Sequence, residues 1–178
     1  MRALAVACIM LALSSTSAKS EVADSSANGF TTKLALNIGG SPDVVYSKLL
    51  RVGDWWSSEH TFSGDAHNLS LEPKAMGCFC EKLARGGAVR HMEVVFLAPG
   101  KTMVLSGALG PLQTLAATGS MTINFSAAED GTKLSVSYAV TGYLPAGMNT
   151  WAAPVDGVLR EQFTRLKNYV EHGDPEKR

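Results

Sequence analysis

The sequence predicts an α+β domain in which a curved antiparallel sheet of about seven strands grips one long C-terminal helix, with two short helices after the first strand. Three patterns predict it. Apolar and polar residues alternate with period two between residues 30 and 38, as in a half-buried strand. Turn dipeptides recur at strand spacing from residue 68 to 143, and apolar residues recur at helical spacing after residue 150. Consecutive hairpins form an antiparallel sheet, and its apolar face is the surface on which the helix can bury its stripe.

The first strand and the two short helices follow from local signals. The alternating strand over residues 30–38 stops at a pair of glycines. Ser41-Pro42-Asp43 then predicts a helix start, because serine can cap the helix, proline fits its first turn and aspartate complements its dipole. This helix runs to about Leu50, and a second short helix begins at Gly53-Asp54.

Six further strands and the long helix complete the pattern. The strands are expected over residues 68–72, 78–83, 88–98, 101–106, 118–127 and 133–143. The last two are joined by Glu129-Asp130-Gly131, an Asp-Gly hairpin signal. Apolar residues from Trp151 to Val170 recur with helical period, and the helix is expected to end before Gly173.

The composition of the chain excludes some classes of protein and partner. The 178 residues carry 16 basic and 16 acidic side chains, so no electrostatic excess favours a nucleic acid, and we predict no nucleic-acid partner. Three cysteines are too few for a disulfide scaffold. The hydrophobic content of 46% is ordinary for a globular domain.

The chain begins with the pattern of a secretory signal. One basic residue precedes an apolar run over residues 3–13, and small residues follow up to Ala18. The run is too short to span a bilayer, which needs about 20 apolar residues. We predict a signal peptide over residues 1–18, hence a secreted or periplasmic protein with no integral membrane segment in the mature chain. A flexible leader is expected over residues 19–28, the domain over 29–172 and a disordered tail over 173–178.

The order of elements resembles the START-like helix-grip superfamily, also called SRPBCC, and most closely its polyketide-cyclase/dehydrase and lipid-transport branch. The resemblance covers about residues 30–170. It is carried by four segments: Ser41-Pro42-Asp43-Val44-Val45-Tyr46, Val52-Gly53-Asp54-Trp55-Trp56, Val94-Val95-Phe96-Leu97-Ala98-Pro99-Gly100-Lys101 and Leu159-Arg160-Glu161-Gln162-Phe163-Thr164-Arg165-Leu166-Lys167. These segments indicate a shape and no shared catalytic signature. The resemblance implies an apolar cavity between the sheet and the long helix.

We therefore expect a module that binds a small hydrophobic molecule, either a lipid or an aromatic, polyketide-like compound, without a cofactor. The expected cavity wall comprises Trp55, Arg90, Met92, Val94, Phe96, Leu105, Met121, Trp151, Val155 and Leu159. One alternative is a cyclase or dehydratase that uses the same cavity. Another is an interaction module with a filled core, presenting the apolar loop at residues 107–114 to a partner. The sequence leaves the ligand and the oligomeric state open.

Three polar residues interrupt the strand at residues 88–98 and are candidates for acid–base chemistry. Arg90 shares a face with Met92 and the following apolar residues, so it is expected inside. His91 and Glu93 point the other way, and we favour the outer, solvated face of the sheet for both.

Two further sets of residues were weighed for chemistry. Cys78 and Cys80 lie on one face of a strand. We favour two small unpaired side chains over a metal site, and an oxidised pair or mixed disulfide stays open because the sequence does not fix their redox state. No metal site is predicted. His60 and His67 flank a glycine-containing loop, where we favour ordinary surface histidines over a gate.

Overall fold

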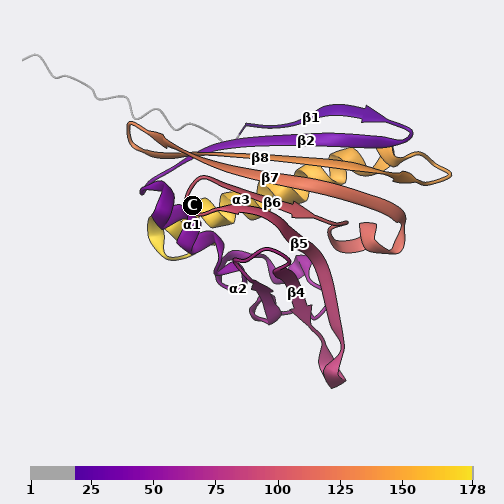
Figure 1. Ribbon diagram of the computed structural model, residues 1–178, viewed down its shortest axis with the longest axis horizontal. Coiled ribbons are helices and arrows are strands. Elements are labelled where there is room, and N and C mark those ends of the chain that lie inside the picture. Colours follow the sequence, from indigo (N-terminus) through magenta and orange to yellow (C-terminus); the bar gives the residue numbers. More distant parts are fainter. Residues whose placement is uncertain (1–18, 178) are drawn as a thin grey trace, which may run out of the picture.

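The computed structural model describes residues 19–177, and the predicted signal peptide lies outside the described residues. Within them, eight strands form one antiparallel sheet in the order β1-β2-β8-β7-β6-β5-β4-β3 (Figure 1). The count is therefore eight rather than about seven. The strands are β1 (Lys19–Ser26), β2 (Gly29–Ile38), β3 (Leu69–Leu71), β4 (Cys78–Lys82), β5 (Ala88–Ala98), β6 (Thr102–Ser106), β7 (Ala116–Ala128) and β8 (Gly131–Tyr143).

The additional strand is β1, which occupies the segment expected to be a flexible leader. It pairs antiparallel with β2 from Lys19 opposite Ala35 to Ser26 opposite Gly29. Residues 21–28 are exposed, so the segment has no buried face and no hydrophobic alternation that could have predicted it. Backbone hydrogen bonds to the edge of β2 hold this strand, because an unpaired edge offers a row of free N–H and C=O groups.

Three α-helices accompany the sheet: α1 (Pro42–Leu49), α2 (Val52–Trp55) and α3 (Ala152–His172). The two short helices follow β2, as predicted. Single 3-10 turns lie at η1 (Ser58–His60), η2 (Ala66–Asn68), η3 (Ala84–Gly86), η4 (Gly110–Thr114) and η5 (Met148–Trp151). Gly173 ends α3 in the left-handed conformation, with φ of 74°, which glycine adopts without a steric cost.

The segment after Gly173, expected to be a disordered tail, returns along α3. The Asn168 side-chain amide donates to the carbonyl of Pro175 at 3.2 Å, and the Arg165 guanidinium pairs with the Glu176 carboxylate. These contacts join the tail to the last turns of the helix.

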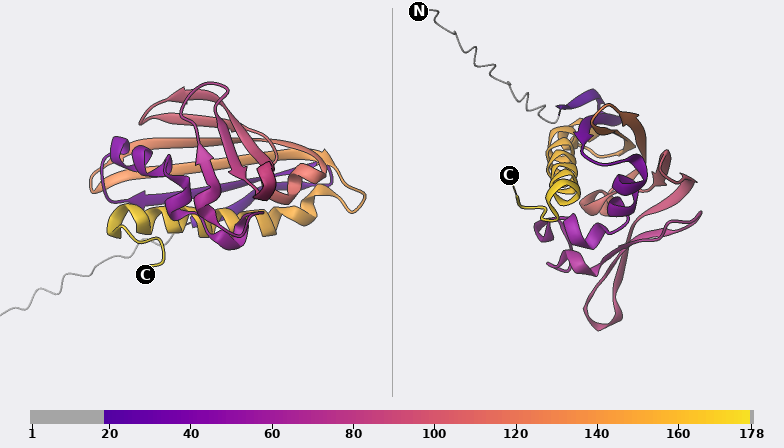
Figure 2. Two further views of the ribbon diagram at one scale, coloured as in Figure 1. Left: turned by 90° about the horizontal axis from the view of Figure 1, so that it is seen from below. Right: turned by 90° about the vertical axis from the view of Figure 1, so that its left-hand side faces the viewer.

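The sheet curls around α3, which runs along its inner face (Figure 2). The C-terminal half of the helix buries Phe163, Leu166 and Tyr169. Inward-facing residues of the central strands, among them Val136 and Tyr138 on β8, complete the core. The predicted grip of one long helix by an antiparallel sheet is confirmed.

Two β-bulges interrupt β5 and change which residues face inward. On β4, Phe79 and Cys80 pair with Met92 and Arg90, so His91 is an extra residue on β5. A second irregularity between Val94 and Phe96 inserts Val95 in the same way. Each bulge places two consecutive residues on one side of the strand. His91 and Met92 are accordingly both buried, while Val95 and Phe96 are both exposed.

The bulges overturn three predictions made from strict alternation. His91, expected on the solvated face, is 4% exposed. Arg90, expected inside, has a side chain that is 68% exposed and pairs with Glu93 at 3.1 Å. Phe96, expected in the cavity wall, is 53% exposed. A bulge shifts the pleat by one residue, and the periodicity of the sequence carries no signal of where this happens.

Candidate functional site

A pocket of about 240 Å³ lies between the first half of α3 and the β4–β5 part of the sheet. Its walls are completed by η4 and by loop 57–65, which follows α2 and contains η1. The lining side chains are mostly apolar, with several aromatic rings. They are Trp56, Glu59, His60, Thr61, Phe62, Leu69, Phe79, His91, Leu109, Gly110, Pro111, Leu112, Trp151, Pro154, Val155, Val158 and Leu159.

The expected wall residues divide into four groups. Trp151, Val155 and Leu159, all from the start of α3 or the turn before it, line the pocket. Trp55, Leu105 and Met121 line a separate internal cavity of about 30 Å³. Met92 and Val94 are buried in the core. Arg90 and Phe96 lie on the outer surface.

The two adjacent tryptophans both line the small internal cavity, and Trp56 alone also reaches the larger pocket. Trp56, which sequence reasoning did not select, lines the pocket and donates its indole N–H to the carbonyl of His60 at 3.1 Å. Trp55 donates to the carbonyl of Leu49 at 3.2 Å. Both indole nitrogens therefore have a partner, as buried tryptophans usually do.

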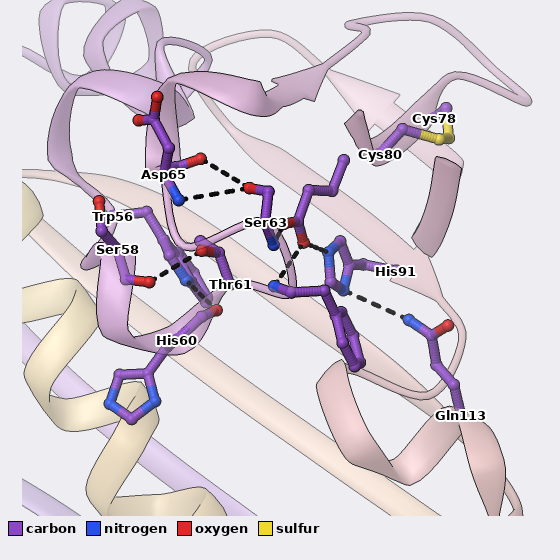
Figure 3. Close-up of polar contacts among 12 residues, drawn as sticks. Trp56, Ser58, His60, Thr61, Ser63, Asp65, Cys78, Cys80, His91 and Gln113 are labelled. Atoms are coloured by element: carbon purple, nitrogen blue, oxygen red, sulfur yellow. Dashed lines mark hydrogen bonds and ion pairs between the residues drawn. A yellow bond between two sulfur atoms is a disulfide. The ribbon is translucent and has the colours of Figure 1, made fainter. Parts of the chain in front are cut away.

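A hydrogen-bonded chain of three polar side chains, the buried Glu81 and His91 and the partly exposed Gln113, meets the pocket at His91. Glu81 is fully buried, and its carboxylate lies 3.0 Å from Nε2 of His91. On the other side of the ring, the Gln113 amide nitrogen lies 3.3 Å from Nδ1 (Figure 3). An amide nitrogen can only donate, so these contacts assign the neutral tautomer in which Nε2–H donates to Glu81 and Nδ1 accepts from Gln113.

Burial and hydrogen bonding set the charges of this chain. Burial lowers the pKa of His91 below 6.5, and the Glu81 carboxylate opposes this shift only in part. For Glu81, burial alone would raise the pKa. Hydrogen bonds from Ser63, Phe62 and His91 outweigh burial and hold that pKa below 4.5. At neutral pH the pair is a carboxylate beside a neutral imidazole.

Loop 57–65 is fastened to the rest of the domain at several points. Its first amide, that of Ser57, donates to the Gln162 side-chain oxygen on α3 at 2.7 Å. The His60 ring contacts the Glu161 carboxylate at 3.1 Å. The backbone amides of Phe62 and Ser63 both donate to Glu81. Glu81 therefore holds both the pocket histidine and the loop that covers it.

Two phenylalanines flank the imidazole. The Phe62 ring stacks on His91 with centroids 5.9 Å apart and planes inclined by 21°. The Phe79 ring lies 5.2 Å away on a tilted plane. Phe62 is 51% exposed, which places its ring at the mouth of the pocket. His60 also lines the mouth, whereas His67 is an exposed residue that bonds to the carbonyl of Gly53.

The loop at residues 107–114 packs onto the core. The Tyr138 hydroxyl donates to the carbonyl of Gly107 at 3.1 Å and accepts from the amide of Leu109 at 2.9 Å. Burial raises the pKa of Tyr138 to about 12. Leu112 is buried, so the apolar character expected to attract a partner is used in large part inside the molecule.

Cys78 and Cys80 form a disulfide on the outer face of β4 (Figure 3), which corrects the expectation of unpaired side chains. Both are half-buried, with Phe79 between them facing inward. Their Cα atoms are 5.3 Å apart, close enough for a bridge. Across residues 19–177, no three side chains of the metal-ligating types gather at one point.

Comparison with solved structures supports the helix-grip shape at low sequence identity. A conserved protein of unknown function from Enterococcus faecalis superposes with a TM-score of 0.62 at 17% identity, over 90% of this chain and 82% of that chain. CalU16 from Micromonospora echinospora gives 0.59 at 14% identity, over 88% and 86%. DynU16, a protein of the dynemicin biosynthetic locus, gives 0.56 at 14% identity, over 83% of this chain and 49% of its own. No family model and no curated protein matches the chain.

Taken with the sheet topology, these likenesses establish a helix-grip type of fold. Among the helices of residues 19–177, none combines the length and the apolar character that crossing a bilayer demands.

Proposed function

We propose that this protein binds a small hydrophobic molecule in the pocket beneath loop 57–65, after export by the predicted signal peptide. The observation that carries the proposal is an apolar, partly aromatic pocket of about 240 Å³ that receives one buried polar side chain, His91. Pockets of this kind, apolar with a few placed polar groups, are the usual form of a ligand site. The likeness to CalU16 and DynU16 agrees with membership of the polyketide-cyclase/dehydrase and lipid-transport branch.

The size of the pocket favours a compact ligand over a long acyl chain. An apolar cavity of about 150 Å³ holds benzene, so the space here suits an aromatic compound of one or two rings. Trp56, Phe62, Phe79 and Trp151 offer ring faces and edges to such a compound. Burying about 250 Å² of ligand surface at about 25 cal/mol per Å² favours binding by about 6 kcal/mol before the cost of association. We therefore expect a dissociation constant of about 40 μM or weaker for a purely apolar ligand.

The test is calorimetric titration with 2-naphthol. We expect saturable binding that is lost in Val155→Trp, whose indole would fill the pocket from α3. Val44→Trp is the matched control, because Val44 is an exposed residue of α1 that does not line the pocket. Equal binding by both variants, or no binding by the native protein, would contradict the proposed site. Native mass spectrometry of protein from a periplasmic extract would identify a natural ligand and test export at once.

A further inference from the structure

The buried pair at the pocket wall is more than an apolar ligand requires. Glu81 is fully buried and His91 is 4% exposed, and burying such groups is costly unless each is hydrogen-bonded. A pocket that only held an apolar molecule would be better served by hydrophobic side chains of similar volume. The burial of Glu81 and His91 at the pocket wall therefore suggests that the pair takes part in a reaction.

We propose that the pocket is a catalytic site in which His91 is the general base that removes a proton from a bound aromatic compound, with Glu81 as its positioning residue. This inference rests on the proposed function, because it needs a ligand in the same pocket. The substrate class is a small aromatic molecule with an acidic C–H or O–H.

The tautomer of His91 determines which ring nitrogen can act as the base. Because Nε2–H is committed to Glu81 at 3.0 Å, the free electron pair of the imidazole resides on Nδ1. Its partner in the described structure is the Gln113 amide at 3.3 Å, a long hydrogen bond. Gln113 belongs to η4, whose residues 110–112 form one wall of the pocket. A hydrogen-bond donor on the ligand that displaces the Gln113 amide would contact Nδ1 of His91, whose ring is already oriented by the Glu81 carboxylate.

The surroundings of the pair suit proton transfer. The Glu81 carboxylate is held charged by the amides of Phe62 and Ser63, so it can stabilise the imidazolium that forms when Nδ1 takes a proton. Burial keeps the imidazole neutral before the reaction, which leaves it free to accept. The other charged groups facing this space are Glu59 and His60 at the mouth, with Glu161 beyond His60. On β5 itself, Arg90 and Glu93 pair with one another on the outer face.

The elimination of 5-nitrobenzisoxazole tests for a base in an apolar pocket without knowledge of the natural substrate. The base takes the proton from C3, the electrons of that C–H bond form the nitrile, and the N–O bond breaks to leave a coloured phenolate. Atoms and charge balance once the imidazolium releases its proton to water. The compound is a two-ring aromatic of the size expected for the pocket.

We expect the native protein to exceed an equal concentration of free imidazole by at least about 100-fold, the lower end for a positioned acid–base group. Gln113→Ala should raise the rate several-fold by uncovering Nδ1, and His91→Asn should abolish it. His67→Asn, which removes an exposed histidine outside the pocket, should leave the rate unchanged. The native rate should rise with pH to a plateau, with a midpoint below that of free imidazole, since burial lowers the pKa of His91.

Binding of the probe is followed separately by quenching of tryptophan fluorescence. Binding without turnover, turnover that survives His91→Asn, or a rate that keeps rising in proportion to hydroxide would overturn the catalytic inference alone. Absence of binding would contradict the proposed function as well. Should His91→Asn fail to fold, the Gln113→Ala comparison and the native pH profile still decide between the outcomes.

Discussion

Glu81→Leu is the substitution that most directly tests the organisation of the pocket wall. Leucine keeps much of the volume but removes the acceptor for three donors: the amides of Phe62 and Ser63 and Nε2–H of His91. We expect the folded state to lose stability, and loop 57–65 to open more often.

The magnitude follows from the exposure of each abandoned donor. Phe62 is half exposed and Ser63 is partly exposed, so water can replace the carboxylate at their amides at modest cost. His91 is buried, and a buried donor without a partner costs about 1–3 kcal/mol. Loss of the charge-assisted contacts adds to this, so the free energy of unfolding should fall by about 2–4 kcal/mol.

Urea unfolding measures the global loss, and amide hydrogen exchange at Phe62 and Ser63 measures the local one. Glu72→Leu is the matched control, because Glu72 forms an exposed ion pair with Lys74, and such pairs contribute about 0–1 kcal/mol. A loss below about 1 kcal/mol for Glu81→Leu, with unchanged exchange at both amides, would refute the assignment of Glu81 as the anchor of this loop.

Three further outcomes follow from the same structure. Since the pKa values of His91 and Glu81 are both lowered on folding, the unfolded chain binds protons first on acidification. Urea titrations should therefore show the free energy of unfolding falling as the pH drops from about 6.5, and falling again below about pH 4.5. A free energy of unfolding that stays constant between about pH 4 and 7 would contradict this. Tyr138→Phe should cost about 1–3 kcal/mol by thermal unfolding. It should also reduce the loss of stability expected above pH 10, where the raised pKa of Tyr138 is titrated; an unchanged loss would contradict this. Replacing Cys78 and Cys80 together by serine should cost no more than about 1.5 kcal/mol, because the bridge closes a ring of three residues; a larger loss of urea stability would assign the disulfide a tertiary role.

The elements that bury a regular face could be predicted from the sequence. The strand beginning near Phe30, the helix started by Ser41-Pro42-Asp43 and the long final helix all lie where the sequence patterns place them, although the Ser41 side chain makes no capping hydrogen bond. These signals report burial on one side of a regular element, which is the physical cause of the pattern. The strand β1 has no buried apolar side and was missed, because it is held mainly by backbone hydrogen bonds to β2, with one side-chain contact from Ser20 to Asp156 on α3.

The site was harder to predict for a related reason. Val155 and Leu159 were found because the helix that carries them is regular. His91 was assigned to the wrong face because the bulge that turns it inward depends on the pairing of β4 with β5, which no local pattern records. Its partners Glu81 and Gln113 come from other segments and were not selected. Glu81 shares the inward face of Phe79 on β4, a period-two signal that was available, whereas Gln113 lies in η4, where no strand periodicity applies.

The two ends of α3 have different roles, and this affects how substitutions along the helix change the protein. Phe163 and Leu166, in the later turns, are buried in the core, whereas Val155 and Val158, in the opening turns, border the pocket. Substitutions in the opening turns would change the shape of the pocket while the later turns continue to pack against the sheet. If the pocket binds a ligand as proposed, its specificity can therefore change through two turns of one helix with little loss of stability.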